Sequence, residues 1–143
     1  MTEGWHGDEY LVIFSQEQSS VMAEKYQLAR VLPGFLLVGL LGWDDFIVMR
    51  PDGVMLKLPT VPMNLVHASP YALPEQLALE PDERFTGKVK WYLKPLVFGG
   101  DAEADGNITW VSLDQHAQLV VWWNAQYRTA AGQGQDINKP ANC

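Results

Sequence analysis

Short apolar runs separated by turn residues fill the first half of the chain. Residues 10–14 (YLVIF) form a continuous apolar run, which at this length fits either a central strand or a buried helical turn. Strands are expected at residues 35–38, 45–50 and 54–58, the last two joined by an Arg-Pro-Asp-Gly turn at 50–53. Strands connected by such tight turns predict an antiparallel meander.

A helix is expected between the first run and this meander. Ser19 and Ser20 offer an N-cap, because their short side chains can accept hydrogen bonds from the free N–H groups of a first turn. The helix would run through Ala29, with Met22 and Tyr26 on the same face as that alanine. This face is expected to be buried.

A second helix is expected near the C-terminus. Ser112 opens it, because Gln115 follows three residues later in the arrangement of a capping box. Trp122 and Trp123 are adjacent and therefore lie on different faces of the helix. Trp123 is expected in the core, and Trp122 is the better candidate for a contact residue. The expected apolar stripe consists of His116, Val120, Trp123 and Tyr127.

The rest of the chain gives no sign of a second core or an internal repeat. Residues 88–93 alternate as a strand does, and residues 95–98 are expected to form a buried strand before a Gly-Gly turn. Residues 131–143 are rich in Gly, Gln and Asn and are expected to be a mobile tail. The sequence therefore predicts a single α+β domain over residues 1–130.

The charge of the chain limits its partners. Its 143 residues include 17 acidic and 10 basic side chains, which gives a net charge of −7. Nucleic acid is disfavoured as a direct ligand, because binding phosphates requires clusters of Lys and Arg. An excess of acid serves either solubility alone or the binding of a basic partner. No feature of the sequence indicates an oligomeric state.

Several features favour a cytoplasmic protein without a cofactor. Cys143 is the single cysteine, so neither an intrachain disulfide nor a cysteine-based metal site is expected. The first ten residues lack the pattern of a signal peptide, and the apolar stretch at 31–43 is interrupted and too short for a bilayer. No glycine-rich phosphate loop is present, which disfavours a nucleotide cofactor.

An acidic loop precedes the second helix. Asp101, Glu103 and Asp105 alternate and are followed by Gly106, which resembles the first half of a calcium-binding loop. The twelfth position of that template requires a bidentate Glu, but Ser112 stands there. A solvated loop is the favoured interpretation, a surface for a basic partner is compatible with it, and a calcium-responsive module is the alternative.

A pair of carboxylates lies at an expected strand end. Asp44 and Asp45 follow Trp43, but neighbours on a strand point to opposite faces, so the rim of a binding surface is favoured over an acid–base dyad. The histidines have no metal-binding spacing. A small hydrolase or transferase site, formed by the two aspartates with His67 or His116, is the third hypothesis.

The central region resembles a known family. Residues 32–39 (LPGFLLVG), 43–49 and 54–62 (VMLKLPTVP) follow the order of elements in the SUKH superfamily, with the Val-Gly pair at 38–39 at a strand end. The similarity extends over about residues 19–62. This superfamily is best known for the immunity proteins of bacterial polymorphic toxins, and it has relatives in fungal cell-wall regulation.

The resemblance implies both a fold and a function. It implies a twisted antiparallel sheet with helices packed around it, in a cytoplasmic protein that is not an enzyme. Such a protein binds and neutralises a cognate toxin, often a nuclease, and an acidic inhibitor suits a basic nuclease because opposite fields speed their encounter. The residues expected on the binding surface are Asp44, Asp45, Asp101, Glu103 and Asp105, with Trp43 and Trp122 as aromatic anchors.

Overall fold

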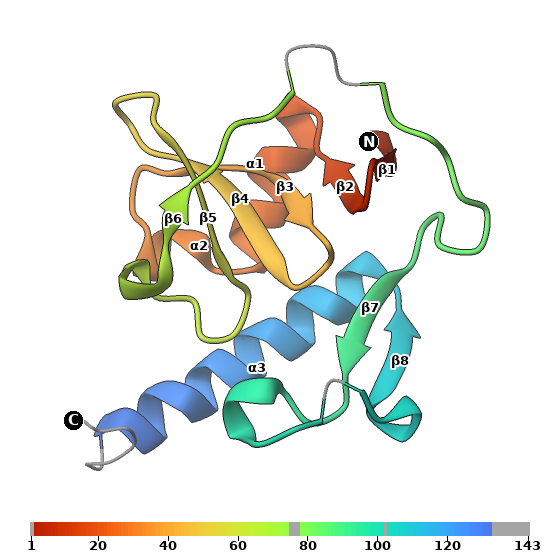
Figure 1. The fold of residues 1–143 in the computed structure, drawn as a ribbon. Coiled ribbons are helices and arrows are strands. Elements are labelled where there is room, and N and C mark those ends of the chain that lie inside the picture. Colours follow the sequence, from red (N-terminus) through yellow and green to blue (C-terminus); the bar gives the residue numbers. More distant parts are fainter. Residues whose placement is uncertain (1, 75–77, 102, 133–143) are drawn as a thin grey trace.

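A six-stranded antiparallel sheet forms the centre of the computed structural model, which describes residues 2–74, 78–101 and 103–132 (Figure 1). Its strands follow one another in chain order. They are β1 (Thr2–His6), β2 (Glu9–Ile13), β3 (Leu36–Leu41), β4 (Asp45–Met49), β5 (Met55–Pro59) and β6 (Ser69–Pro70). A second sheet pairs β7 (Val89–Tyr92) with β8 (Ile108–Val111).

Three α-helices accompany the sheets (Figure 1). They are α1 (Gln16–Lys25), α2 (Leu28–Val31) and α3 (Leu113–Gly132), with short 3₁₀ turns η1 (Leu65–His67), η2 (Leu96–Phe98) and η3 (Asp105–Asn107). Helix α1 packs on β3, and α3 packs against both α1 and β7. This arrangement confirms the predicted α+β fold in a single domain. Over the described residues, no helix combines the length and the apolar character needed to cross a bilayer.

The predicted meander is confirmed. β3, β4 and β5 pair in succession, and the Arg50–Gly53 turn closes with hydrogen bonds from Gly53 N to Arg50 O and from Arg50 N to Val54 O. The ambiguous run at 10–14 is a strand, β2. Three strands were not anticipated: β1, which pairs with β2, the two-residue β6, which pairs with β5, and β8, which pairs with β7.

The start of the first helix was predicted wrongly. Ser15 is the N-cap of α1 and forms a capping box with Gln18, whereas the Ser19 hydroxyl donates a hydrogen bond to Leu37 O at 2.6 Å. The helix ends early because Gln27 adopts a left-handed backbone conformation with φ of 57°. Because this residue interrupts the helix, α2 does not continue the expected face of α1. It buries Leu28 and leaves Ala29 exposed.

Other expectations were met in part. The capping box at Ser112 is confirmed, with Gln115 N 3.2 Å from Ser112 Oγ. Residues 95–98 do not form a strand; η2 occupies most of this segment. Helix α3 continues to Gly132, two residues into the expected tail, and residues 133–143 lie outside the described part of the chain.

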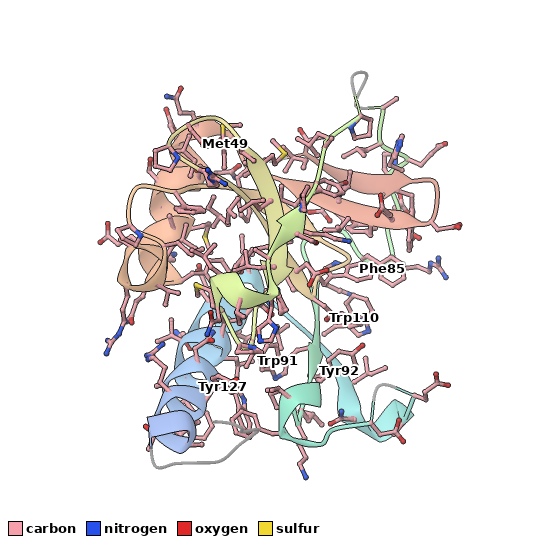
Figure 2. All side chains as sticks on the ribbon, turned by 60° about the vertical axis from the view of Figure 1, so that its left-hand side comes forward. Met49, Phe85, Trp91, Tyr92, Trp110 and Tyr127 are labelled. Atoms are coloured by element: carbon pink, nitrogen blue, oxygen red, sulfur yellow. The ribbon has the colours of Figure 1, made fainter. Side chains whose placement is uncertain are left out.

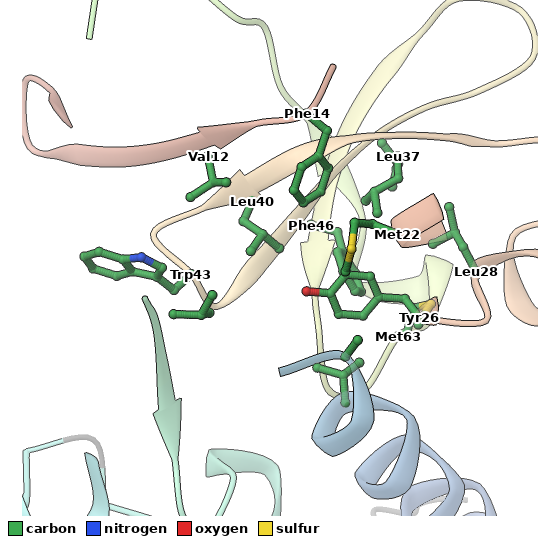
Figure 3. Packing of buried hydrophobic residues seen from close by; sticks show 14 of the residues in the cluster. Val12, Phe14, Met22, Tyr26, Leu28, Leu37, Leu40, Trp43, Phe46 and Met63 are labelled. Carbon is green, nitrogen blue, oxygen red and sulfur yellow. The ribbon is translucent and has the colours of Figure 1, made fainter. Parts of the chain in front are cut away.

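One core joins the sheet to α1 and α3 (Figure 3). The Tyr26 ring of the α1–α2 junction lies edge-on to Phe46 of β4 at 4.9 Å between centroids. Gly39 allows β2 to approach β3, because a Cβ there would overlap the carbonyl oxygen of Val12. The register shifts at this point of β3, between Leu37 and Gly39. A side chain at position 39 would therefore force the two strands apart.

An aromatic cluster connects the two sheets. It consists of Trp5, Tyr10, Trp43, Phe85 and Trp110, whose rings contact one another at centroid distances between 4.6 and 6.1 Å. Trp43 stacks on Tyr10 at 4.6 Å between ring centroids. Phe85 stacks on Trp110 at 4.8 Å, and these two side chains lie next to each other in Figure 2. Because its members come from β1, β2, the β3–β4 turn, the 82–88 loop and β8, the cluster fixes the small sheet against the large one.

Candidate functional site

A pocket of about 280 Å³ opens beside the turn between β3 and β4. Four parts of the chain build it: this turn, the end of β5, the end of β7 and the first turns of α3. The side chains that line it are Trp43, Asp44, Asp45, Pro59, Thr60, Val61, Trp91, Tyr92, Pro95 and His116. Concave, mostly apolar pockets with a few convergent polar groups are the usual locations of binding sites.

The β3–β4 turn holds the carboxylates at the pocket. Gly42 and Trp43 both have a positive φ, of 58° and 64°, which is rare for a tryptophan. Backbone hydrogen bonds fix both ends of the turn, from Gly42 N to Tyr10 O at 2.7 Å and from Thr60 N to Asp44 O at 2.9 Å. Asp44 belongs to the turn and not to the strand, so Asp44 and Asp45 line the same pocket rather than opposite faces.

Asp44 is paired with a lysine from the small sheet. Lys90 Nζ lies 3.0 Å from Asp44 Oδ2 and 3.0 Å from the Tyr92 hydroxyl, and it sits over the Tyr92 ring at 4.8 Å. Burial raises the pKa of Asp44 despite the attraction of Lys90. For Lys90, burial acts to lower the pKa, but Tyr92 and Asp44 outweigh it and the pKa is raised. The raised pKa of Lys90 keeps its ammonium group charged at neutral pH.

Asp45 differs from its neighbour. It is half-buried, and within the described part of the chain its carboxylate has no hydrogen-bond or ion-pair partner. Burial raises its pKa, the nearby charge of Asp44 raises it further, and Lys57 opposes both. A carboxylate that has lost part of its water without gaining a partner is a favourable place for a cation.

His116 lies beneath the pocket and is completely buried. Its Nδ1 is 2.6 Å from the Tyr26 hydroxyl. If the hydroxyl donates to Nδ1, only the Nε2–H is left without a partner, whereas the opposite tautomer would leave both the hydroxyl proton and Nε2 unsatisfied. The first arrangement is therefore favoured. Burial lowers the pKa of His116 to about 3, so the ring is neutral.

The structure brings together three of the seven residues expected on a binding surface. Trp43, Asp44 and Asp45 line the pocket, although Trp43 is only 7% exposed and forms a wall rather than a protruding anchor. Trp122 lies apart on α3 and is 55% exposed. The remaining three belong to the loop before β8, where Asp101 and Glu103 are exposed and the side chain of Asp105 is outside the description.

The acidic loop is folded on itself by hydrogen bonds. Asp101 Oδ1 accepts from Glu103 N at 2.8 Å, and the Asn107 side chain bonds the backbone of Lys94 on both sides and the carbonyl of Asp101. These contacts engage groups that a calcium ion would require. In residues 2–74, 78–101 and 103–132, no three acidic, histidine or cysteine side chains lie close enough to hold a metal.

Lys90 and the aromatic walls of the site were not among the residues predicted from the sequence. Lys90 and Tyr92 alternate along β7 and share one face, which the pattern KVKWYL at 88–93 could have indicated. Trp91 and Thr60 carried no usable signal. His116 was considered beside the aspartates and does line their pocket, whereas His67 is exposed on η1.

Comparisons with known proteins give no relative from which a function could be transferred. No protein-family model, no curated protein and no solved structure matches the chain.

Proposed function

We propose that this chain is a cytoplasmic immunity-type protein that binds and neutralises a basic bacterial toxin by covering its active cleft. The proposal combines the resemblance to the SUKH superfamily with the geometry of the pocket. The observation that carries it is the position of Asp44 and Asp45, both at the edge of an open pocket beside a rigid aromatic cluster. Acidic groups on a rigid support favour fast association with a cationic protein and cost little ordering on binding.

The polar groups around the pocket support binding over catalysis. General acid–base chemistry needs a titratable group within reach of a substrate, with a pKa near the working pH. His116 is inaccessible and neutral, and Asp44 is occupied by Lys90. Among the described residues lining the pocket, this leaves Asp45 as a carboxylate without a second group to share a proton.

The test starts from the genes that flank the one encoding this chain. The toxin encoded there is expressed in a bacterial host with and without this protein, and surviving colonies are counted. Co-expression is expected to restore growth, and the purified pair is expected to bind with a Kd on the order of micromolar or tighter, weakening as salt is added.

A matched pair of variants separates the pocket from general charge. The double variant Asp44→Asn with Asp45→Asn should lose protection, whereas Asp8→Asn with Glu9→Gln, which removes the same two charges from exposed positions at the β1–β2 turn, should keep it. A flanking toxin that neither binds the wild-type protein nor is neutralised by it would overturn the proposal.

A further inference from the structure

We propose that the pocket is the seat for an arginine side chain of the partner, and that Asp45 is the carboxylate that receives its guanidinium group. This inference rests on the proposed function, because it assumes a protein partner. It goes further by naming the side chain that enters the pocket and the residue that binds it.

The two aspartates of the pocket differ in whether they already contact a cation. Asp44 already has a cation, with Lys90 Nζ at 3.0 Å, whereas the carboxylate of Asp45 is unpaired within the described residues. Both line the same pocket. An incoming positive charge therefore finds one available carboxylate, and a charge-assisted hydrogen bond to it is stronger than one between neutral groups.

The chain's own lysine shows how this region holds a cation. Lys90 Nζ lies 4.8 Å from the centre of the Tyr92 ring and 5.9 Å from the centre of the Trp43 ring, in addition to its contact with Asp44. Both aromatic residues also line the pocket. Aromatic faces attract cations, and a planar guanidinium stacks on them better than an ammonium does.

The floor and walls of the pocket fit a long side chain with a charged end. Trp91, Val61 and Pro95 supply apolar surface for the three methylene groups of an arginine. The floor adds a buried, neutral His116, which contributes no positive charge to repel the guanidinium. Arginine and aromatic residues seated in pockets are the side chains that most often dominate the energy of protein interfaces.

The direct test uses small probes and the indole N–H signals of the protein. N-acetyl-arginine amide is titrated into ¹⁵N-labelled protein, and the assigned Trp43 and Trp91 signals are followed. Saturable shifts are expected with the arginine probe. The citrulline analogue has the same shape without the charge and should give none, and the corresponding lysine probe should bind more weakly.

Three variants give expectations of different sign. Asp45→Asn should weaken the arginine probe by at least about tenfold, since hydrogen bonds to charged groups contribute about 1.5–3 kcal/mol, while Asp45→Glu should restore part of the binding. Lys90→Gln should strengthen the probe by roughly several-fold, because it removes a positive charge and releases Asp44. Asp8→Asn is the control for net charge and should change nothing.

The outcomes separate this inference from the proposed function. Equal binding of the flanking toxin to wild type and Asp45→Asn, with no probe shifts, overturns the arginine seat and leaves the immunity function standing. Probe binding that depends on Asp45, with a toxin that does not bind, overturns the immunity function and supports the seat. Equal shifts with arginine and citrulline show that charge is not recognised, which also overturns the seat.

Discussion

Acidification should destabilise the protein through one buried side chain, His116. In the unfolded chain the ring takes up a proton near pH 6.5, whereas burial in the fold lowers its pKa to about 3. Between these values the unfolded state binds more protons than the folded state, so the free energy of unfolding falls as the pH falls. The full change corresponds to about 5 kcal/mol, of which about 2.5 kcal/mol lies between pH 6 and pH 4.

The assay compares wild type with His116→Asn. The amide oxygen of asparagine is as many bonds from Cβ as the histidine Nδ1, so it can still accept the Tyr26 hydroxyl proton, but the side chain does not titrate. Urea unfolding is followed by tryptophan fluorescence at several pH values, and the difference in unfolding free energy between the two proteins is plotted. This subtraction removes the contribution of the carboxylates, which titrate in both proteins. The wild type is expected to lose about 2.5 kcal/mol more than the variant between pH 6 and pH 4. Parallel profiles would refute the assignment of a buried, neutral histidine.

Three further predictions address the scaffold and the acidic loop. Asn124→Ala should lower the free energy of unfolding by about 3 kcal/mol in urea, because the Met63 N–H and the Thr60 carbonyl, each bonded to Asn124 at 2.7 Å, would lose their partner. Gln126→Ala, on the exposed face of α3, should change it little. Gly39→Ala should lower the thermal midpoint or abolish folding, while Gly106→Ala, where a methyl group has open space, should not. Calorimetry at millimolar calcium should give no saturable heat, because Asp101 already bonds the loop backbone; a saturable heat would support the calcium-responsive alternative.

Local signals explain most of the correct predictions about the fold. The Arg-Pro-Asp-Gly turn and the pairing of Ser112 with Gln115 depend on residues within four positions of one another, so the sequence is sufficient to find them. The start of the first helix was harder to predict, because three serines near it can all act as N-caps. Gln18, three residues after Ser15, completes a capping box and so selects Ser15 as the N-cap. Nothing in the sequence indicates that Gln27 adopts a left-handed backbone conformation.

Non-local pairing explains what was missed. β1 is held by β2 on one side and by Glu80 on the other, through Trp5 N and O, so its strand character depends on a residue 75 positions away in the chain. The pocket also depends on residues far apart in the chain, since it combines the turn at Trp43 with β7 and α3. Periodicity placed the aspartates on a strand end, but it gave no means of bringing His116 or Lys90 to them.

The left-handed Trp43 makes the acidic turn inseparable from the rest of the molecule. A bulky residue adopts that backbone conformation only where its surroundings impose it, and here the ring is enclosed by Tyr10, Phe85 and Trp110 from three distant segments. A peptide copied from this hairpin would relax to another shape, and grafting its sequence onto a foreign scaffold would not reproduce the arrangement of its two carboxylates. An engineer who wished to borrow these carboxylates would have to borrow the aromatic cage behind them as well.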